Sequence, residues 1–371
     1  MTKQERAEAI AEPAAMQRRR HANALAREFA VQQLPMIAVT LALGFLVAYM
    51  QYGYIPGADR PFPIAGVRVS VWHLIVMGVV TGYLMTLVGQ AAGILALPYS
   101  TSVLQFTNPH VSSTMLVLTF IGPAGALLGF RRSGQWNIDF AWAVCLGGAV
   151  GAFVGPLFRA TVLANADVFR LTLGIALGLF GLQLCWKAVR DYTRTGATRG
   201  HDFMTPAEDG KPMRFSIKTL ERGLLRTRIR FGSHERTLSN HAMFVIGAAV
   251  GAFSAALGVG GGFLLVPIFA TVYRLPLYVM VAATIPYTIV LSLIGILTFT
   301  VILPVFAIPS IAPEWSWGLF AAAGGLLGSW VASKSQLLIA EHLLNWLLGG
   351  ITVIAGALYV LSFAFELPFA L

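Results

Sequence analysis

Two glycine- and proline-rich segments interrupt long apolar stretches of this 371-residue sequence. The first reads GQAAGILALP, from Gly89 to Pro98, and the second reads GVGGGFLLVP, from Gly258 to Pro267. Glycines let the backbone adopt positive φ and approach a ligand closely. A helix that restarts after such a break points free N–H groups and its positive dipole end toward whatever fills the break. Each segment is therefore a candidate anion site and ends in proline, and Pro267 suits the first turn of the half-helix that follows the second break.

The candidate ligands are the residues of both breaks and the hydroxyl side chains that follow them. Gln90 adds a side-chain amide to the first break. Hydroxyls in apolar helices often bond to backbone carbonyls, so capping and helix-to-helix contacts remain alternatives for each position. The candidate substrate-binding residues are Gly89, Gln90, Gly93, Pro98, Ser100, Thr101, Ser113, Thr114, Gly258, Gly260, Gly261, Gly262, Pro267, Thr284 and Tyr287.

The composition excludes most soluble proteins. Hydrophobic residues make up 57% of the chain and charged residues 11%, with mean hydropathy +0.72, whereas soluble domains are about 45–50% apolar and about 25% charged. The net charge of +10 fits the enrichment of Lys and Arg on the cytoplasmic side of membrane proteins better than binding to nucleic acid. We therefore expect an all-α polytopic membrane protein.

Apolar segments of about 20 residues are long enough to span a bilayer. The predicted spans are 35–54, 111–130, 138–158, 168–187, 281–303, 317–333 and 343–364. Residues 72–106 and 242–273 are also apolar but contain the two breaks, so we expect each to fold as a broken, re-entrant helix.

The glycine pattern recurs in two halves of the chain. Gly82, Gly89, Gly93 and Pro98 match Gly251, Gly258, Gly262 and Pro267 at one constant offset. Further pairs keep the same order: Gly147, Gly148 and Gly151 with Gly324, Gly325 and Gly328, and Gly174 and Gly181 with Gly349 and Gly356. We infer an internal duplication.

Charge distribution decides how the halves are oriented. If every apolar segment crossed once, most basic residues would lie outside, against the positive-inside rule. If each broken segment instead enters and returns on one side, only Arg60, Arg68, Arg159 and Arg170 lie outside. Each half then crosses an odd number of times, so the second half is inverted, as in many secondary transporters.

This topology divides the chain into five parts. The N-terminus and the central loop would be cytoplasmic, and the C-terminus periplasmic. The predicted parts are a cytoplasmic segment 1–34, an N-terminal anchor 35–54, repeat 1 at 72–187, a basic cytoplasmic loop 188–240 and repeat 2 at 241–364.

Charged groups are missing from the middle of the apolar stretches. Without a buried carboxylate, no proton relay of the Asp or Glu type is indicated, and we expect backbone dipoles and neutral donors to hold an anion. Arg159 and Arg170 flank an external turn, where they either anchor helix ends or attract anions. Cys145 and Cys185 show no metal or disulfide spacing, and no catalytic residue, metal or cofactor is predicted.

The paired breaks and the polar loop between the halves identify a resemblance. The chain resembles the sulfite exporter TauE/SafE family of membrane transporters over roughly 72–364. The resemblance implies transport of a small sulfur-containing anion, such as sulfite, thiosulfate or an organosulfonate like sulfoacetate, across the bacterial inner membrane. In the second motif it covers Gly258, Gly260, Gly261, Gly262 and Pro267, and in the degenerate first motif Gly89, Gly93 and Pro98.

The sequence thus predicts a secondary transporter that binds its anion between opposed half-helix N-termini. Its partners would be the sulfur anion and the lipid bilayer, with homo-oligomerisation left open. Three alternatives remain: an anion channel, a membrane-embedded enzyme without a recognisable catalytic grouping, and a receptor or assembly protein that acts through the loop 188–240.

Overall fold

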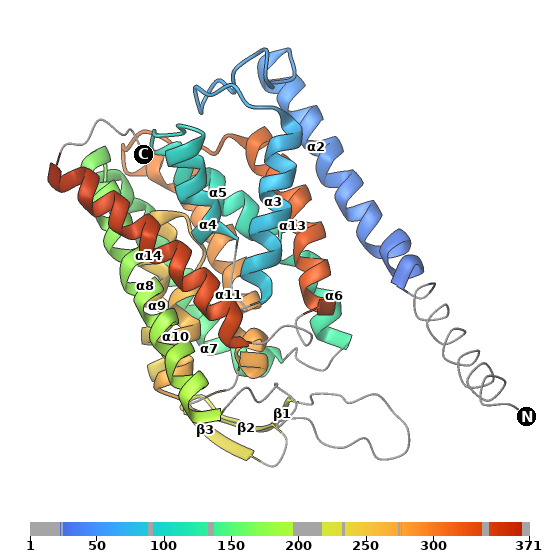
Figure 1. The fold of residues 1–371 in the computed structure, drawn as a ribbon, viewed down its shortest axis with the longest axis vertical. Coiled ribbons are helices and arrows are strands. Elements are labelled where there is room, and N and C mark those ends of the chain that lie inside the picture. The colour runs from blue at the N-terminus through green and yellow to red at the C-terminus, as the bar shows by residue number, and fades with distance from the viewer. Residues whose placement is uncertain are drawn as a thin grey trace, which may run out of the picture.

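A computed structural model of the chain describes residues 23, 25–87, 92–132, 137–195, 217–231, 234–273, 275, 277–335 and 341–365. Most of these residues are helical, with one small sheet (Figure 1). The elements of the first half are η1 (Phe29–Gln33), α2 (Leu34–Tyr52), α3 (Val71–Leu87), α4 (Gly93–Pro98), η2 (Tyr99–Val103), α5 (His110–Ile121), α6 (Ala124–Arg132), α7 (Ile138–Thr161) and α8 (Ala166–Thr195).

The elements of the second half follow the sheet. They are β1 (Ile217–Arg222), β2 (Arg226–Phe231), β3 (His234–Ser239), α9 (Asn240–Leu257), α10 (Gly262–Thr271), α11 (Leu277–Leu297), η5 (Thr298–Ile302), α12 (Leu303–Val305), α13 (Trp315–Ser335) and α14 (Glu341–Phe365).

Seven helices of the described chain are long and apolar enough to cross a membrane. Their bounds are Leu25–Tyr52, His110–Leu127, Ile138–Thr161, Ala166–Val189, Asn240–Leu257, Ala283–Val305 and Asn345–Phe363. Six coincide with predicted spans, and the seventh is α9. The remaining prediction, 317–333, does form helix α13, but that helix is almost wholly buried between others and less apolar.

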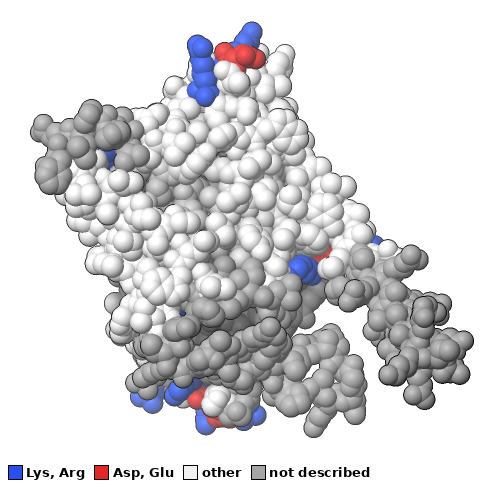
Figure 2. Space-filling model, viewed as in Figure 1, with Lys and Arg blue, Asp and Glu red and all other residues white. Residues whose placement is uncertain are grey.

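The two ends of the molecule differ. One end carries residues 53–70, between α2 and α3, and we call it the loop end; the opposite end carries β1, β2 and β3, and we call it the sheet end (Figure 1). Charged side chains gather at these ends, and the visible surface between them is largely uncharged (Figure 2). Large apolar side chains on the outer helices are exposed there, among them Leu46, Val150, Leu182 and Ile354, so this band suits a lipid environment.

Local signals explain where helices begin and end. Asn137 caps α7 by accepting a hydrogen bond from the Phe140 amide at 3.1 Å, and Ser239 precedes α9 in the same role. Gly53 ends α2 in the left-handed conformation that glycine tolerates. The predicted span 111–130 is divided at Gly122 into α5 and α6.

The sheet is the main feature that the all-helical prediction missed. Its antiparallel strands occupy part of the predicted loop 188–240. In β2, Thr227, Ile229 and Phe231 are buried while the intervening arginines are exposed. This alternation of polar and apolar residues, RTRIRF, is the strand signal that could have revealed it.

The helices pack in matched pairs. α3 packs against α13 of the other half, and α9 packs against α7. A methyl group at Gly147 would lie 2.1 Å from the Phe244 carbonyl oxygen, and one at Gly324 would lie 2.0 Å from that of Ile75. The two contacts are repeat-related, because Gly147 matches Gly324 and Ile75 occupies the position of Phe244. The duplicated glycines therefore let neighbouring backbones approach closely.

Candidate functional site

The first break separates α3 from α4. α3 ends at Leu87 and α4 begins at Gly93; the predicted ligands Gly89 and Gln90 lie outside the described residues. After α4 the chain returns to the loop end, where the Asn108 side chain donates a hydrogen bond to the Ile64 carbonyl at 2.5 Å. The first broken segment thus enters and leaves at one end of the molecule.

The second break separates α9 from α10 and depends on glycine. Gly258 and Gly260 have φ of +81° and +75°, a region in which L-residues with a side chain are strained. Gly261 precedes α10 and provides no side-chain cap for its first turn. α10 then returns to the sheet end, where Phe269 contacts Phe140 at the start of α7, with ring centroids 6.1 Å apart.

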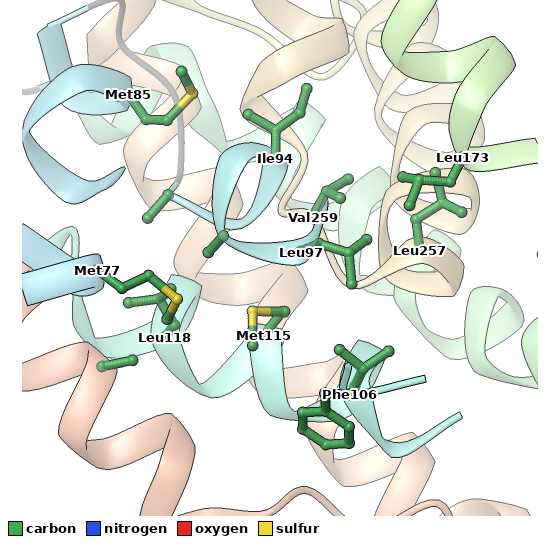
Figure 3. Close-up of a cluster of buried hydrophobic side chains, with 14 of the residues drawn as sticks. Met77, Met85, Ile94, Leu97, Phe106, Met115, Leu118, Leu173, Leu257 and Val259 are labelled. Carbon is green, nitrogen blue, oxygen red and sulfur yellow. The ribbon is translucent and has the colours of Figure 1, made fainter. Parts of the chain in front are cut away.

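The two breaks meet inside the protein. A methyl group at Gly93 would lie 2.7 Å from the Val259 carbonyl oxygen and 2.8 Å from the Thr119 methyl group. Val259, Leu257 and Leu97 lie together in one buried apolar cluster (Figure 3). The α4 start of one half is therefore in backbone contact with the break of the other half.

Tyr287 lies beside the second break. Its ring fits between two glycines: a methyl group would lie 1.9 Å from the ring if placed on Gly261 and 2.4 Å if placed on Gly148. Its hydroxyl donates to the Gly247 carbonyl at 2.8 Å. The side chain is fully buried, so Tyr287 ties α11, α7 and α9 together around the break.

The predicted hydroxyl ligands are buried but largely engaged with the protein. Ser113 and Thr114 both donate to the His110 carbonyl, at 3.0 and 2.7 Å. Thr101 bonds to the Leu97 carbonyl and lies 2.5 Å from the Tyr359 hydroxyl. Among the described residues the Ser100 hydroxyl has only methionine sulfurs as partners, 3.7 Å away in Met77 and 4.0 Å away in Met115. Thr284 is buried and also engaged.

Pro267 does not take the predicted position. Pro267 lies inside α10, five residues after its start at Gly262, and Pro98 is the last residue of α4. The expectation that Pro267 lies in the first turn of its half-helix is wrong, because glycine itself starts α10, as it also starts α4. The first-turn N–H groups of α10 thus follow three glycines rather than a proline.

Two buried polar features near the breaks were not predicted. The hydroxyls of Thr119 on α5 and Ser292 on α11 are 2.8 Å apart, a bond that joins the halves next to Gly93. The buried Ser254 hydroxyl has no hydrogen-bond partner in the described part of the chain. Ser254 lies one turn before Gly258, and this spacing is the signal that could have drawn attention to it.

Two charged residues are buried as well, in contrast to the expectation that charge is absent from the interior. Arg159, near the end of α7, is 1% exposed. Glu314 at the loop end is fully buried and accepts hydrogen bonds from the Tyr52 hydroxyl, the Ser316 hydroxyl and the Ile64 amide, at 2.7, 2.9 and 3.0 Å. Both residues lie at the ends of apolar segments. The sequence does not show how deeply a helix end is buried, so the burial of these two charges could not be predicted.

Comparison with known proteins agrees with this architecture. The chain is 26% identical over 289 residues to a protein of Xylella fastidiosa strain Temecula1 named "Probable membrane transporter protein", covering 76% of this chain and 92% of that protein. A protein of strain 9a5c with the same name is 27% identical over 290 residues, with the same coverage. No solved structure matches the chain.

The family comparison covers both breaks. The family model for the sulfite exporter TauE/SafE matches residues 74–359, from the first turn of α3 to the last turns of α14. The chain is therefore a multi-pass membrane transporter of the sulfite exporter TauE/SafE family.

Proposed function

We propose that this protein is a secondary transporter that moves a small sulfur-containing anion, namely sulfite, thiosulfate or an organosulfonate such as sulfoacetate. The anion would bind at the junction of the two breaks, against the first turn of α10 and the start of α4. The observation that carries this proposal is the contact between Gly93 and Val259, which brings the start of one half-helix to the break before the other.

The proposed ligands are backbone donors supported by neutral side chains. Gly260, Gly261 and Gly262 would supply N–H groups on one side, after the turn at Gly258, whose own N–H donates to the Ser254 carbonyl at 2.8 Å. Gly93, with Gly89 and Gln90, would supply them on the other. One helix dipole contributes about 0.3–1 kcal/mol, and up to about 2 kcal/mol when partly buried. Removing water from an anion costs far more, so several donors must act together. The Ser254 hydroxyl, which has no partner among the described residues, is a further donor within one turn of the break.

The matched packing of the halves supports an inverted repeat and alternating access. α3 starts from the loop end and α9 starts from the sheet end (Figure 1), so the equivalent helices run in opposite directions. Equivalent positions of the two repeats make equivalent contacts, namely Gly147 with Phe244 and Gly324 with Ile75. Rocking one half against the other around the breaks would expose the anion first at one end and then at the other.

The basic sheet supports the proposed orientation. Positive charge favours the cytoplasmic side, and β2 alone exposes Arg226, Arg228 and Arg230. We therefore place the sheet end in the cytoplasm and the loop end in the periplasm, in a bacterial inner membrane. Labelling of an exposed residue of the sheet, such as Leu224→Cys, from the periplasmic side would contradict this orientation.

Counterflow in proteoliposomes tests the proposed function. Vesicles loaded with sulfite, thiosulfate, sulfoacetate, taurine or sulfate would be diluted into tracer amounts of the same labelled compound. We expect at least one sulfur anion to give a saturable overshoot that protein-free vesicles lack. Single-channel currents without saturation would favour a channel, and no flux for any of these compounds would refute the transport of sulfur anions.

A further inference from the structure

Arg159 is a buried cation with no acidic partner among the residues that the structure describes. It lies in the last turn of α7 and is 1% exposed. Its Nε donates to the Ser112 hydroxyl at 3.3 Å, and its Nη1 donates to the Leu163 carbonyl. The guanidinium carbon lies 4.0 Å from the centre of the Phe169 ring. In the described part of the chain, no Asp or Glu side chain lies within salt-bridge distance of it.

These neutral contacts use only part of the binding capacity of the guanidinium. Arginine has five N–H donors and stays protonated in proteins. The two hydrogen bonds engage Nε and one Nη1 hydrogen, which leaves the other Nη1 hydrogen and the Nη2 group for another acceptor. A buried charge is strongly unfavourable unless an opposite charge compensates it. An anionic ligand would supply that compensation.

Ser112 connects Arg159 to the second break. The Ser112 backbone packs directly on Gly258, where a methyl group would lie 2.3 Å from the Ser112 carbonyl oxygen. Leu163 and Phe169, which contact the guanidinium, belong to the same buried cluster as Leu257 and Val259. Figure 3 shows Leu257 and Val259 at the break, with Leu173 of α8 beside them. Arg159 is thus one residue away from the break, on its loop-end side.

We propose that Arg159 and Ser112 form a binding site for an oxyanion of sulfur next to the second break. The planar guanidinium can hold two oxygens of a sulfonate or sulfite at once, which a lysine ammonium cannot do. An anion held there can pass directly to the N–H groups of Gly260, Gly261 and Gly262. This inference rests on the proposed anion transport and adds a cation to a site otherwise built from neutral donors.

A purely structural role predicts a different result. The bond to the Leu163 carbonyl also caps the C-terminal end of α7, where a cation is favourable. If capping were the whole role, Arg159→Met would lower thermal stability but leave the KM for the anion unchanged. If Arg159 binds the anion, the KM rises while the maximal rate can be retained.

The test compares Arg159→Met and Arg159→Lys with Arg68→Met, which removes an exposed charge at the same end. Sulfite, thiosulfate and sulfoacetate would be the probes, in counterflow and in thermal-shift measurements. Loss of a charged hydrogen bond predicts a KM about 10-fold higher or more for Arg159→Met, a smaller rise for Arg159→Lys and none for Arg68→Met. The thermal shift that the anion causes in the wild type should disappear in Arg159→Met.

The readouts separate the two proposals. If the wild type transports an anion and Arg159→Met keeps the wild-type KM and thermal shift, the Arg159 site is refuted and transport stands. If no anion is transported but one stabilises the wild type and not Arg159→Met, the site stands and transport is refuted. If both Arg159 variants fail to fold, Ser112→Ala replaces them: it keeps the charge, and an unchanged KM in it would refute the site.

Discussion

The Gly93 backbone touches the Val259 carbonyl, so the two breaks of the chain share one junction. A methyl group at Gly93 would lie 2.7 Å from that oxygen, closer than carbon and oxygen atoms ordinarily pack. Gly93 starts α4 in the first half, and Val259 lies between the positive-φ glycines of the second half. Motion of one half relative to the other must therefore change this contact.

Gly93→Ala should damage both packing and transport. The added methyl group has backbone on one side and Thr119 on the other, and overpacking costs about 1–3 kcal/mol. The matched control is Gly178→Ala, because nothing lies within 4 Å of that position. We expect Gly93→Ala to lower both the melting temperature and the counterflow rate, with Gly178→Ala at or above wild-type stability. Wild-type flux in Gly93→Ala would contradict the role of the junction.

Gly260→Ala separates strain from function. Its φ of +75° is close to that of Gly53, +70°, at the end of α2 and outside the breaks. A side chain in the left-handed region costs roughly 1–2 kcal/mol, so both alanine variants should lose similar stability. Only Gly260→Ala should also lose anion flux. Equal flux in the two variants would show that the second break merely connects helices.

Glu314→Gln tests the buried carboxylate at the loop end. The carboxylate accepts hydrogen bonds on both oxygens, and the amide would turn one of them into a donor. Hydrogen bonds to charged groups contribute about 1.5–3 kcal/mol, so we expect a clear fall in the melting temperature. Thermal unfolding monitored by tryptophan fluorescence measures this fall. The exposed Glu221→Gln is the control, and an equal effect of both substitutions would contradict the network.

The pairing of β2 with β3 should weaken slightly in acid, because the ion pairs of Glu235 are solvent-exposed and each contributes little. The hydrogen bond from Arg230 and the nearby charge of Arg228 lower the pKa of Glu235. The ion pairs therefore stabilise β2 and β3 above the ordinary glutamate pKa of 4.5, and this contribution is lost as pH falls through the lowered value. In the full chain, the protection of the amides of residues 226–231 and 234–239 from hydrogen exchange should decrease in this pH range. In Glu235→Gln the protection of the same amides should not change over that range.

Hydropathy and glycine spacing predicted most of the fold because both reflect direct physical demands. Bilayer thickness requires long apolar helices, and close helix packing requires small residues, as at Gly147 and Gly324. The two glycine-rich breaks could be predicted from the sequence for the same reason. The sheet was not, because its strands are short and carry many charges, and only the alternation around Ile229 reveals them.

The backbone features of the candidate site could be predicted from the sequence better than the contacts of its side chains. Gly258 and Gly260 need positive φ, which glycine reveals directly. The bonding of Ser113 and Thr114 to the His110 carbonyl depends on local rotamers, and the burial of Arg159 depends on the meeting of α5, α7 and α8. Such convergence of segments far apart in the chain cannot be read from composition or spacing.

Hydrogen exchange at the second break tests the central claim most directly. The wild-type protein would be measured with and without the anion that gives counterflow, with a non-transported anion of equal charge as the control. If the N–H groups from Gly260 to Gly262 bind the substrate, their exchange slows only with the transported anion, while the strands 226–231 and 234–239 are unaffected. Unchanged exchange at Gly260–Gly262 under saturating, transported anion would contradict binding at the breaks.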